Sequence, residues 1–150
     1  MVARGLFASK RARADIQPTI AFLCTRASNP DEDDWKKLVR LMSYLKRTKC
    51  LAPTSSAKSM TTLQWHVDAS HAMHPDGKGH AGGTLTLGEG VACNQSAKQK
   101  LNARSSAESE LAGADDLMPQ ILWTNCFLKA QGHTSTATML NQENKSAVLL

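Results

Sequence analysis

Three acidic residues have local settings that could bring them together for chemistry: Asp68, Glu110 and Glu143. Asp68 closes an alternating stretch typical of a strand, Glu110 lies early in a helix-like segment, and Glu143 follows a second short β-like run. Carboxylates from a strand, a helix and a further strand can converge at one edge of a sheet. Hard divalent cations prefer oxygen ligands, and two of them about 3.5–4 Å apart can cleave a phosphodiester. The sequence therefore predicts a metal-binding carboxylate cluster.

Each acid also has an ordinary structural role that the residues alone leave open. Asp68 could cap a turn at the end of its strand, because Asp bonds nearby backbone N–H groups well. Glu108 completes the pattern Ser105-x-x-Glu108 of a capping box, which predicts a structural role for it. Glu110 lies about 200° further round the helix, beside apolar residues, where a carboxylate needs a cation or a donor. Glu143 alone would suit the start of a helix through the macrodipole.

The elements that must position these acids begin with a predicted antiparallel meander of three strands. Residues 63–70 and 90–97 alternate in polarity, and residues 80–87 are rich in Gly and Thr. A Pro-Asp-Gly sequence in the first gap and a Gly-Glu-Gly sequence in the second are turn signals. The first of these strands would carry Asp68 near its end.

Helical and strand segments follow the meander and would carry the other two acids. A helix is predicted over residues 105–131, and Pro119 should kink or divide it, giving two helices in sequence. A short strand is predicted over residues 136–142, directly before Glu143. Residues 144–150 begin what looks like another helix and end on apolar side chains, so we expect a domain truncated at its C-terminus.

Residues 1–50 are predicted to be helical and separate from the sheet. Acidic residues at 31–34 and basic residues at 46–49 suit the two ends of a helix macrodipole. Between them, apolar residues with helical spacing predict a face that packs into a core: Trp35, Leu38, Val39, Met42 and Leu45. The expected organisation is a helical segment at 1–50, a Ser-, Thr- and Ala-rich linker at 51–61 and a domain at 62–150.

The composition of the 150 residues excludes several classes of protein. A hydrophobic content of 41% and a charged content of 21% are those of an ordinary globular chain. No apolar run approaches the roughly 18–20 residues of a membrane span, and residues 1–13 do not show the apolar core and cleavage site typical of a secretory signal, so we expect neither a membrane partner nor secretion. The formal charge of +5 permits a polyanionic partner. Four cysteines without paired spacing indicate a reducing compartment inside the cell.

Three histidines near the first predicted turn raise the alternative of a zinc site: His71, His74 and His80. The cysteine pairs that usually complete such a site are absent, and the Pro-Asp-Gly sequence between them indicates a turn. Metal ligation by these histidines is therefore the less favoured interpretation.

Several sequence blocks occur in the order of a known family. The blocks are Trp65–Ser70, His80–Gly83, Lys98–Lys100, Arg104–Leu111 and Asn141–Ala147. Through them, residues 63–150 resemble the ribonuclease H domain of copia-type (pseudovirid) retrotransposon polyproteins. Residues 1–50 resemble the segment after the polymerase core of the same polyproteins, through Arg13–Ile16, Trp35–Arg40 and Tyr44–Lys46.

The resemblance implies a fold and an activity. The fold would be RNase H-like: a mixed α+β or α/β domain whose first three strands are antiparallel, with helices packed against the sheet. The activity would be hydrolysis of the RNA strand of an RNA–DNA hybrid with two Mg²⁺ ions, or Mn²⁺ in their place. The implied partners are the hybrid and the remainder of the polyprotein, and the implied location is a cytoplasmic particle or the nucleus.

Carried over by position, Asp68 is the first of four family acids, Glu110 the second and Glu143 the third. The third position is normally aspartate, and the extra methylene of Glu143 displaces the carboxylate by more than about 1 Å, enough to cost ~10²-fold in rate. The fourth acid is expected beyond Leu150. These departures predict weak or lost activity, which leaves a non-catalytic nucleic-acid-binding module or a degenerate relic as the alternative.

Basic residues between the third predicted strand and the helix are expected to contact the substrate: Lys98, Lys100 and Arg104. They could equally form a solvated loop, but beside a carboxylate cluster they are better explained as phosphate contacts that position a hybrid without reading its sequence. The run Asn94–Ser96 could contact sugars, where 2′-hydroxyls distinguish RNA from DNA. An unrelated small α+β binding domain is the remote alternative.

Overall fold

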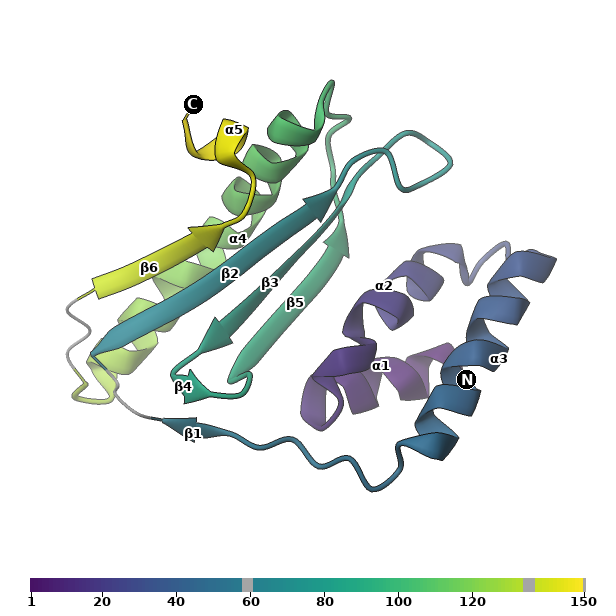
Figure 1. The fold of residues 1–150 in the computed structure, drawn as a ribbon, viewed down its shortest axis with the longest axis horizontal. Coiled ribbons are helices and arrows are strands. Elements are labelled where there is room, and N and C mark those ends of the chain that lie inside the picture. Colours follow the sequence, from purple (N-terminus) through teal and green to yellow (C-terminus); the bar gives the residue numbers. More distant parts are fainter. Residues whose placement is uncertain (58–60, 134–136, 150) are drawn as a thin grey trace. The chain divides into compact units, whose positions relative to one another are not determined.

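The computed structural model describes residues 1–57, 61–133 and 137–149 (Figure 1). The chain forms two compact units, Met1–Pro53 and Thr54–Leu150, and each is described by itself. The predicted linker at 51–61 overlaps the start of the second unit, and its residues 58–60 lie outside the described residues. No helix in the described part of the chain is long and apolar enough to cross a membrane.

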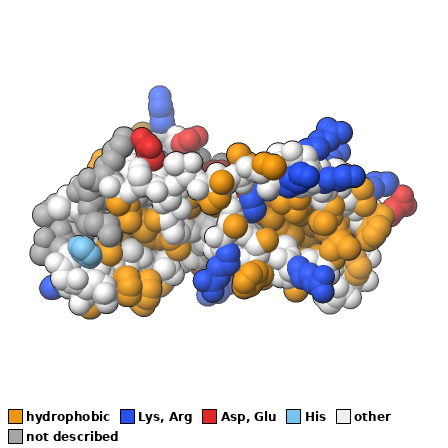
Figure 2. Space-filling view, turned by 90° about the horizontal axis from the view of Figure 1, so that it is seen from below, with side chains coloured by type: hydrophobic (Ala, Val, Ile, Leu, Met, Phe, Trp, Pro, Cys, Tyr) orange, Lys and Arg blue, Asp and Glu red, His pale blue; other side chains and the backbone are white. Residues whose placement is uncertain are grey.

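The first unit is helical. Its elements are α1 (Val2–Arg11), the short 3-10 helix η1 (Ala14–Ile16), α2 (Gln17–Arg26) and α3 (Glu32–Arg47). Its small core consists of Ile16, Ile20, Leu23 and Leu41. Lys and Arg side chains lie beside hydrophobic ones on its surface, toward the right of the view in Figure 2.

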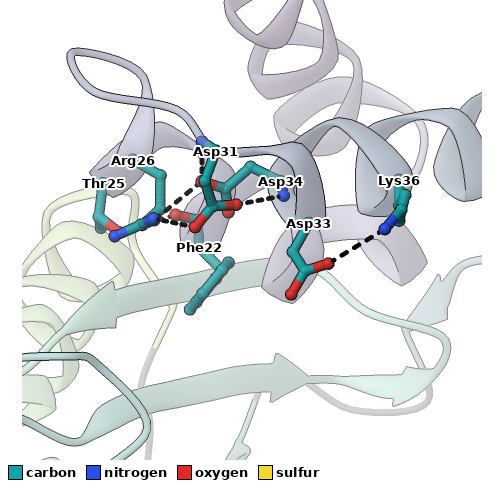
Figure 3. Close-up of polar contacts among 7 residues, drawn as sticks. All are labelled: Phe22, Thr25, Arg26, Asp31, Asp33, Asp34 and Lys36. Carbon is teal, nitrogen blue, oxygen red and sulfur yellow. Dashed lines mark hydrogen bonds and ion pairs between the residues drawn. The ribbon is translucent and has the colours of Figure 1, made fainter.

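Helix α3 begins at a capping box that also anchors the preceding helix. The amide of Asp34 donates to Asp31 Oδ1 at 2.8 Å, and the amide of Asp31 donates to Asp34 Oδ2 at 3.1 Å. Arg26, the last residue of α2, donates through Nε to Asp34 Oδ2 at 2.9 Å and also pairs with Asp31 (Figure 3). Burial raises the pKa of Asp34, but the bonds from Asp31 and Arg26 outweigh it and leave that pKa lowered.

The predicted packing face of α3 is only partly correct. Leu41 is buried, and Leu38 and Leu45 pack against the core, but Trp35, Val39 and Met42 are 61%, 47% and 44% exposed. The physical reason is helical geometry: these three exposed residues lie about 100° round the helix from the buried ones. The apolar spacing predicts one broad buried stripe along α3, whereas the unit buries only the side of that stripe that carries the leucines.

The end of α3 is tied to η1 by a second polar cluster. Arg13 donates to both carboxylate oxygens of Asp15, at 2.9 and 2.7 Å, and Tyr44 donates its hydroxyl to Asp15 at 2.7 Å. Arg13 also donates to the backbone oxygen of Thr48 at 3.0 Å, which satisfies a carbonyl at the end of α3. The hydrogen bond from Arg13 lowers the pKa of Asp15 to about 2, with a further contribution from Tyr44.

Replacing Asp15 with asparagine is expected to destabilise the first unit by about 1–2 kcal/mol, because a bidentate charge-assisted pair is lost. A carboxylate with a lowered pKa stabilises the fold above its unfolded-state pKa of about 4. Its contribution is therefore present at neutral pH and lost as pH falls toward 2. Urea unfolding of the full chain at pH 7, 5 and 3 should show a smaller stability difference between the wild type and the Asp15→Asn variant at pH 3 than at pH 7.

Asp33→Asn is the matched control, since Asp33 is an exposed carboxylate whose pairing with Lys36 is loose, at 3.6 Å. Exposed pairs of this kind contribute about 0–1 kcal/mol. Equal effects of the two substitutions at pH 7 would contradict a role for the Arg13–Asp15–Tyr44 cluster.

The second unit is built on a mixed sheet with the order β5-β3-β2-β6. Its strands are β2 (Thr62–Ser70), β3 (His80–Thr86), β5 (Cys93–Lys98) and β6 (Ala137–Gln142). β2, β3 and β5 pair antiparallel, whereas β6 pairs parallel with β2. This is the mixed α+β architecture that the sequence predicts, with the three-stranded meander first. The short strands β1 (Ser56–Ala57) and β4 (Gly88–Glu89) form a separate two-stranded pair.

One long helix, α4 (Ser106–Ala130), packs behind this sheet (Figure 1). The prediction that Pro119 divides it into two helices is wrong. Pro119 lies on the exposed side, so water can satisfy the carbonyl that its missing N–H leaves free. Leu117 and Ile121 on either side of it are both buried against the sheet, and this packing keeps the helix continuous.

The start of α4 differs in detail from the predicted capping box. The Ser105 hydroxyl accepts from the amide of Glu108 at 3.2 Å, as expected. The Glu108 carboxylate, however, accepts from the amide of Arg104 at 2.6 Å instead of that of Ser105. Glu108 therefore has the structural role that the sequence predicts, but it caps the amide of the residue before the expected one.

The core of the second unit lies between α4 and one face of the sheet. Burial alternates along β2, so that Leu63, Trp65 and Val67 face the helix. They pack with Leu85, Leu117, Ile121 and Leu128. After β6, the short helix α5 (Lys145–Val148) begins at Asn144, whose side chain accepts from the amides of Ser146 and Ala147.

Candidate metal-binding carboxylate site

Asp68 lies on the face of the sheet opposite α4. The alternation of β2 places it among exposed polar residues, with Gln64, His66 and Ser70 on the same side. The parallel register pairs Val67, the residue before Asp68, with Gln142 at the end of β6. Asp68 and the end of β6 are therefore at the same level of the sheet.

Glu110 comes from the first turns of α4, on its buried side, and is only 7% exposed. Its Oε2 accepts a hydrogen bond from Gln142 Nε2 at 2.9 Å. Burial raises the pKa of Glu110, and the neighbouring Asp68 carboxylate raises it further, while the bonds from Gln142 and the Ala69 backbone oppose this. Asp68 and Glu110 are therefore neighbours in the fold, and a metal site built on them stays a prediction.

Gln142 is a residue of this site that the sequence analysis missed. Its Nε2 binds Glu110, and its Oε1 is buried without a hydrogen-bond partner. It is the last residue of β6, where it pairs with Val67, the residue before Asp68, but the sequence alone does not distinguish it until its neighbour Glu110 is known. Its amide holds the Glu110 side chain toward the end of β6.

Glu143 is the first residue after β6 and is exposed. Within residues 1–57, 61–133 and 137–149 no three His, Cys, Asp or Glu side chains are grouped so that they could hold a metal ion. The structure therefore pairs Asp68 with Glu110 but does not add Glu143 to them as a third ligand. The physical difference is that Asp68 and Glu110 are held by a paired strand and a packed helix, whereas Glu143 lies in the two-residue connection to α5.

The donor atoms at this site are all oxygens. Asp68 and Glu110 each supply a carboxylate. This set suits a hard divalent cation such as Mg²⁺. A cation there would also relieve the repulsion between the two carboxylates that helps to raise the pKa of Glu110.

The basic residues predicted to contact phosphates lie at the end of β5 and in the connection from β5 to α4. Lys98 pairs with Asp76 at 2.7 Å and lowers the pKa of that carboxyl. Lys98 and Lys100 line a cavity of about 120 Å³ between α4 and the strands β3 and β5, which Asp116 of α4 also lines. Arg104 is exposed just before α4. Contact of these three basic residues with nucleic acid stays a prediction.

His74 and His80 belong to a buried hydrogen-bonded chain. His74 Nε2 lies 3.0 Å from His80 Nδ1, and His80 Nε2 lies 2.8 Å from Ser96 Oγ. Burial lowers the pKa of His80, and the charge of a protonated His74 would lower it further. The chain joins the β2–β3 loop to β5; the sequence analysis placed Ser96 in a run that could contact sugars, and that contact stays a prediction.

Comparison with known proteins gives one informative relative. The chain is 25% identical over 146 residues to the "Retrovirus-related Pol polyprotein from transposon TNT 1-94" of Nicotiana tabacum. The match covers 95% of this chain and 11% of the polyprotein, so the chain spans about a tenth of that relative. The similarity supports a retrotransposon polyprotein as the source of this chain. No family model matches the chain, and no solved structure matches it.

Proposed function

We propose that the chain is part of the reverse transcriptase and ribonuclease H region of a retrotransposon polyprotein. In this proposal the second unit descends from an enzyme that hydrolyses the RNA strand of RNA–DNA hybrids with divalent metal ions. The observation that carries it is the placement of both acids beside the end of β6: Gln142 pairs with Val67, the residue before Asp68, and donates a hydrogen bond to Glu110. The similarity to a Pol polyprotein supports the same interpretation.

In this function Asp68 and Glu110 would hold Mg²⁺ or Mn²⁺. A bound ion supplies charge neutralisation for the phosphate and activation of a water molecule. Gln142 orients Glu110, since its amide donates to the carboxylate and so selects the ionised form. Asp68 is exposed on the open face of the sheet and is therefore accessible to a substrate strand. Lys98, Lys100 and Arg104 would hold phosphates without reading sequence.

The first test is hydrolysis of a labelled RNA–DNA hybrid by the full chain in Mg²⁺ and in Mn²⁺. We expect slow cleavage, and we expect Asp68→Asn to reduce it at least ~10²-fold, because one of the two anionic ligands is lost. Asp115→Asn is the matched control, since Asp115 is an exposed carboxylate on α4 that lies outside the site. Cleavage that survives Asp68→Asn unchanged would contradict the assignment.

Glu143 allows a test in the opposite direction. Glu143→Asp introduces the aspartate that the resembled family normally has at this position. Its side chain is one methylene shorter, so the carboxylate would lie closer to the backbone. If Glu143 is the reason for weak activity, this variant should cleave up to ~10²-fold faster than the wild type. An unchanged rate would remove Glu143 from the explanation of weak activity.

The second candidate function is a non-catalytic module that holds nucleic acid. It is favoured by the position of Glu143, which does not join the other two acids in a metal-holding group among the residues that the structure describes. This candidate predicts hybrid binding that weakens as salt rises, without dependence on Asp68 or Glu110. Binding that requires divalent metal and both acids would exclude it.

A further inference from the structure

The positive charge of the chain is concentrated in its first unit. Residues 1–53 contain 11 Lys and Arg against 5 Asp and Glu, a formal charge of +6, whereas residues 54–150 contain 7 against 8, a charge of −1. The overall excess of +5 therefore comes from the helical unit alone. The carboxylate pair and the predicted phosphate contacts both lie in the other unit, so they do not explain this excess.

Every carboxylate of the first unit forms an ion pair with one of three Arg or Lys side chains. Arg13 pairs with Asp15, Arg26 pairs with Asp31 and Asp34, and Lys36 pairs with Glu32 and Asp33. The four cations toward and just beyond the end of α3 make no ion pair within the described part of the chain: Arg40, Lys46, Arg47 and Lys49. These cations are exposed and available to an external anion.

The outward side of α3 combines these cations with apolar side chains in two neighbouring stripes. Arg40 and Arg47 lie seven residues apart on one stripe, with exposed Ser43 between them. The adjacent stripe consists of Trp35, Val39, Met42 and Lys46, all exposed. From Trp35 to Arg47 this surface is roughly 18 Å long at 1.5 Å per residue. We call these seven residues the outer face of α3.

We propose that the outer face of α3 binds single-stranded nucleic acid. Arg40, Lys46 and Arg47 would contact backbone phosphates, and the Trp35 ring, 61% exposed, would stack on a base. A cationic groove or face beside an aromatic ring is the combination that binds single strands without sequence preference, because every base has a π-face. The choice of nucleic acid over another polyanion rests on the proposed function of the second unit.

The arrangement favours a nucleic acid over an anionic membrane surface. A helix that lies in a membrane interface keeps a broad apolar side free of charge. On α3 the exposed apolar stripe contains only Trp35, Val39 and Met42, and Lys46 lies within it. The other apolar side chains of the helix are already used, since Leu41 is buried and Leu38 and Leu45 pack against the core of the unit.

The test is binding of the full chain to fluorescent oligodeoxythymidine, followed by anisotropy across a series of salt concentrations. Arg40→Glu with Arg47→Glu should weaken binding at least ~10-fold and should lower the slope of log K against log salt by about 2. Trp35→Ala should weaken binding about tenfold and leave that slope unchanged, because stacking releases no counterions. Arg4→Glu with Arg11→Glu, the same charge change on exposed residues of α1, is the matched control and should have a much smaller effect.

Two outcomes would overturn the proposal. If the α1 and α3 double variants lose affinity equally, only the net charge of the unit matters. If anionic phospholipid vesicles bind in a manner that depends on Trp35 and Arg40 while oligodeoxythymidine does not bind, the partner is a membrane surface. Oligodeoxythymidine has no RNA strand to cut, so this assay reports the outer face of α3 whether or not the hybrid-cleavage proposal survives.

Discussion

Replacing Trp65 with alanine is expected to destabilise the second unit by about 3–5 kcal/mol, the largest effect of any substitution considered. Trp65 is 0% exposed, in the middle of β2, and packs beneath α4 with Leu63, Val67 and Leu117. Its removal would leave a large cavity that a paired strand and a long helix cannot close. This loss is comparable to the whole stability of a small domain, so we expect the unit to be largely unfolded at room temperature.

Hydrogen exchange measured by mass spectrometry can locate this effect. In the Trp65→Ala variant, amides of β2 and α4 should lose protection while those of α1 to α3 keep it, because these helices have a core of their own. Trp65→Phe is the matched control: the indole N–H has no hydrogen-bond partner, so phenylalanine loses packing but no polar contact. A cost for Trp65→Ala below about 1 kcal/mol would contradict the assigned core.

The second large effect is expected from Gly79→Ala, at about 3 kcal/mol. A Cβ at this position would lie 2.8 Å from the backbone oxygen of Ser70 and 2.7 Å from Ser109 Oγ, and would overlap Gln99 Oε1. Gln99 and Ser109 are buried and bonded to each other twice. The Ser109 hydroxyl donates to Gln99 Oε1 at 2.9 Å, and Gln99 Nε2 donates to the backbone carbonyl oxygen of Ser109 at 2.6 Å. Separating them would leave buried polar atoms without partners.

Gly82→Ala is the matched control for this prediction. Gly82 lies within β3, a short way along the chain from Gly79, but the nearest atom to a Cβ added there is the backbone oxygen of Gln95 at 3.5 Å, an ordinary contact. Urea unfolding should place Gly82→Ala within about 1 kcal/mol of the wild type and Gly79→Ala well below it. Because Ser109 precedes Glu110 in α4, Gly79→Ala should also reduce the rate of any hybrid cleavage. The reduction should be at least as large as the fraction of the variant that is unfolded. Similar stabilities for the two variants would remove the Gln99–Ser109 pair from the explanation.

The sequence predicted the sheet well because local pattern and burial coincide there. The alternation over residues 63–70 matches the burial of β2, since one face of that strand meets α4 and the other does not. Polarity also singled out Asp68 and Glu110, which are neighbours in the fold, while their role in binding a metal ion stays a prediction. Within the described residues Glu143 is not grouped with them, and metal binding and catalysis by the three acids stay predictions.

The errors arose where tertiary context decides. Pro119 predicts a helix break, but its exposed position and the buried neighbours Leu117 and Ile121 keep α4 whole. Trp35 has the spacing of a core residue, yet the side of α3 that carries it is exposed within its unit. Gln142 was overlooked because an amide in a short strand has no distinctive signal until its neighbour Glu110 is known.

The proline within α4 also bears on how this helix opens. The missing N–H at Pro119 interrupts the ladder of i to i−4 bonds between the turns that carry Glu110 and the turns that carry Leu128. Fraying that begins at the C-terminal end of α4 therefore meets this interruption before it reaches Glu110. Local unfolding can thus be confined to the distal half, and the half that presents the carboxylate can stay ordered as a separate cooperative segment.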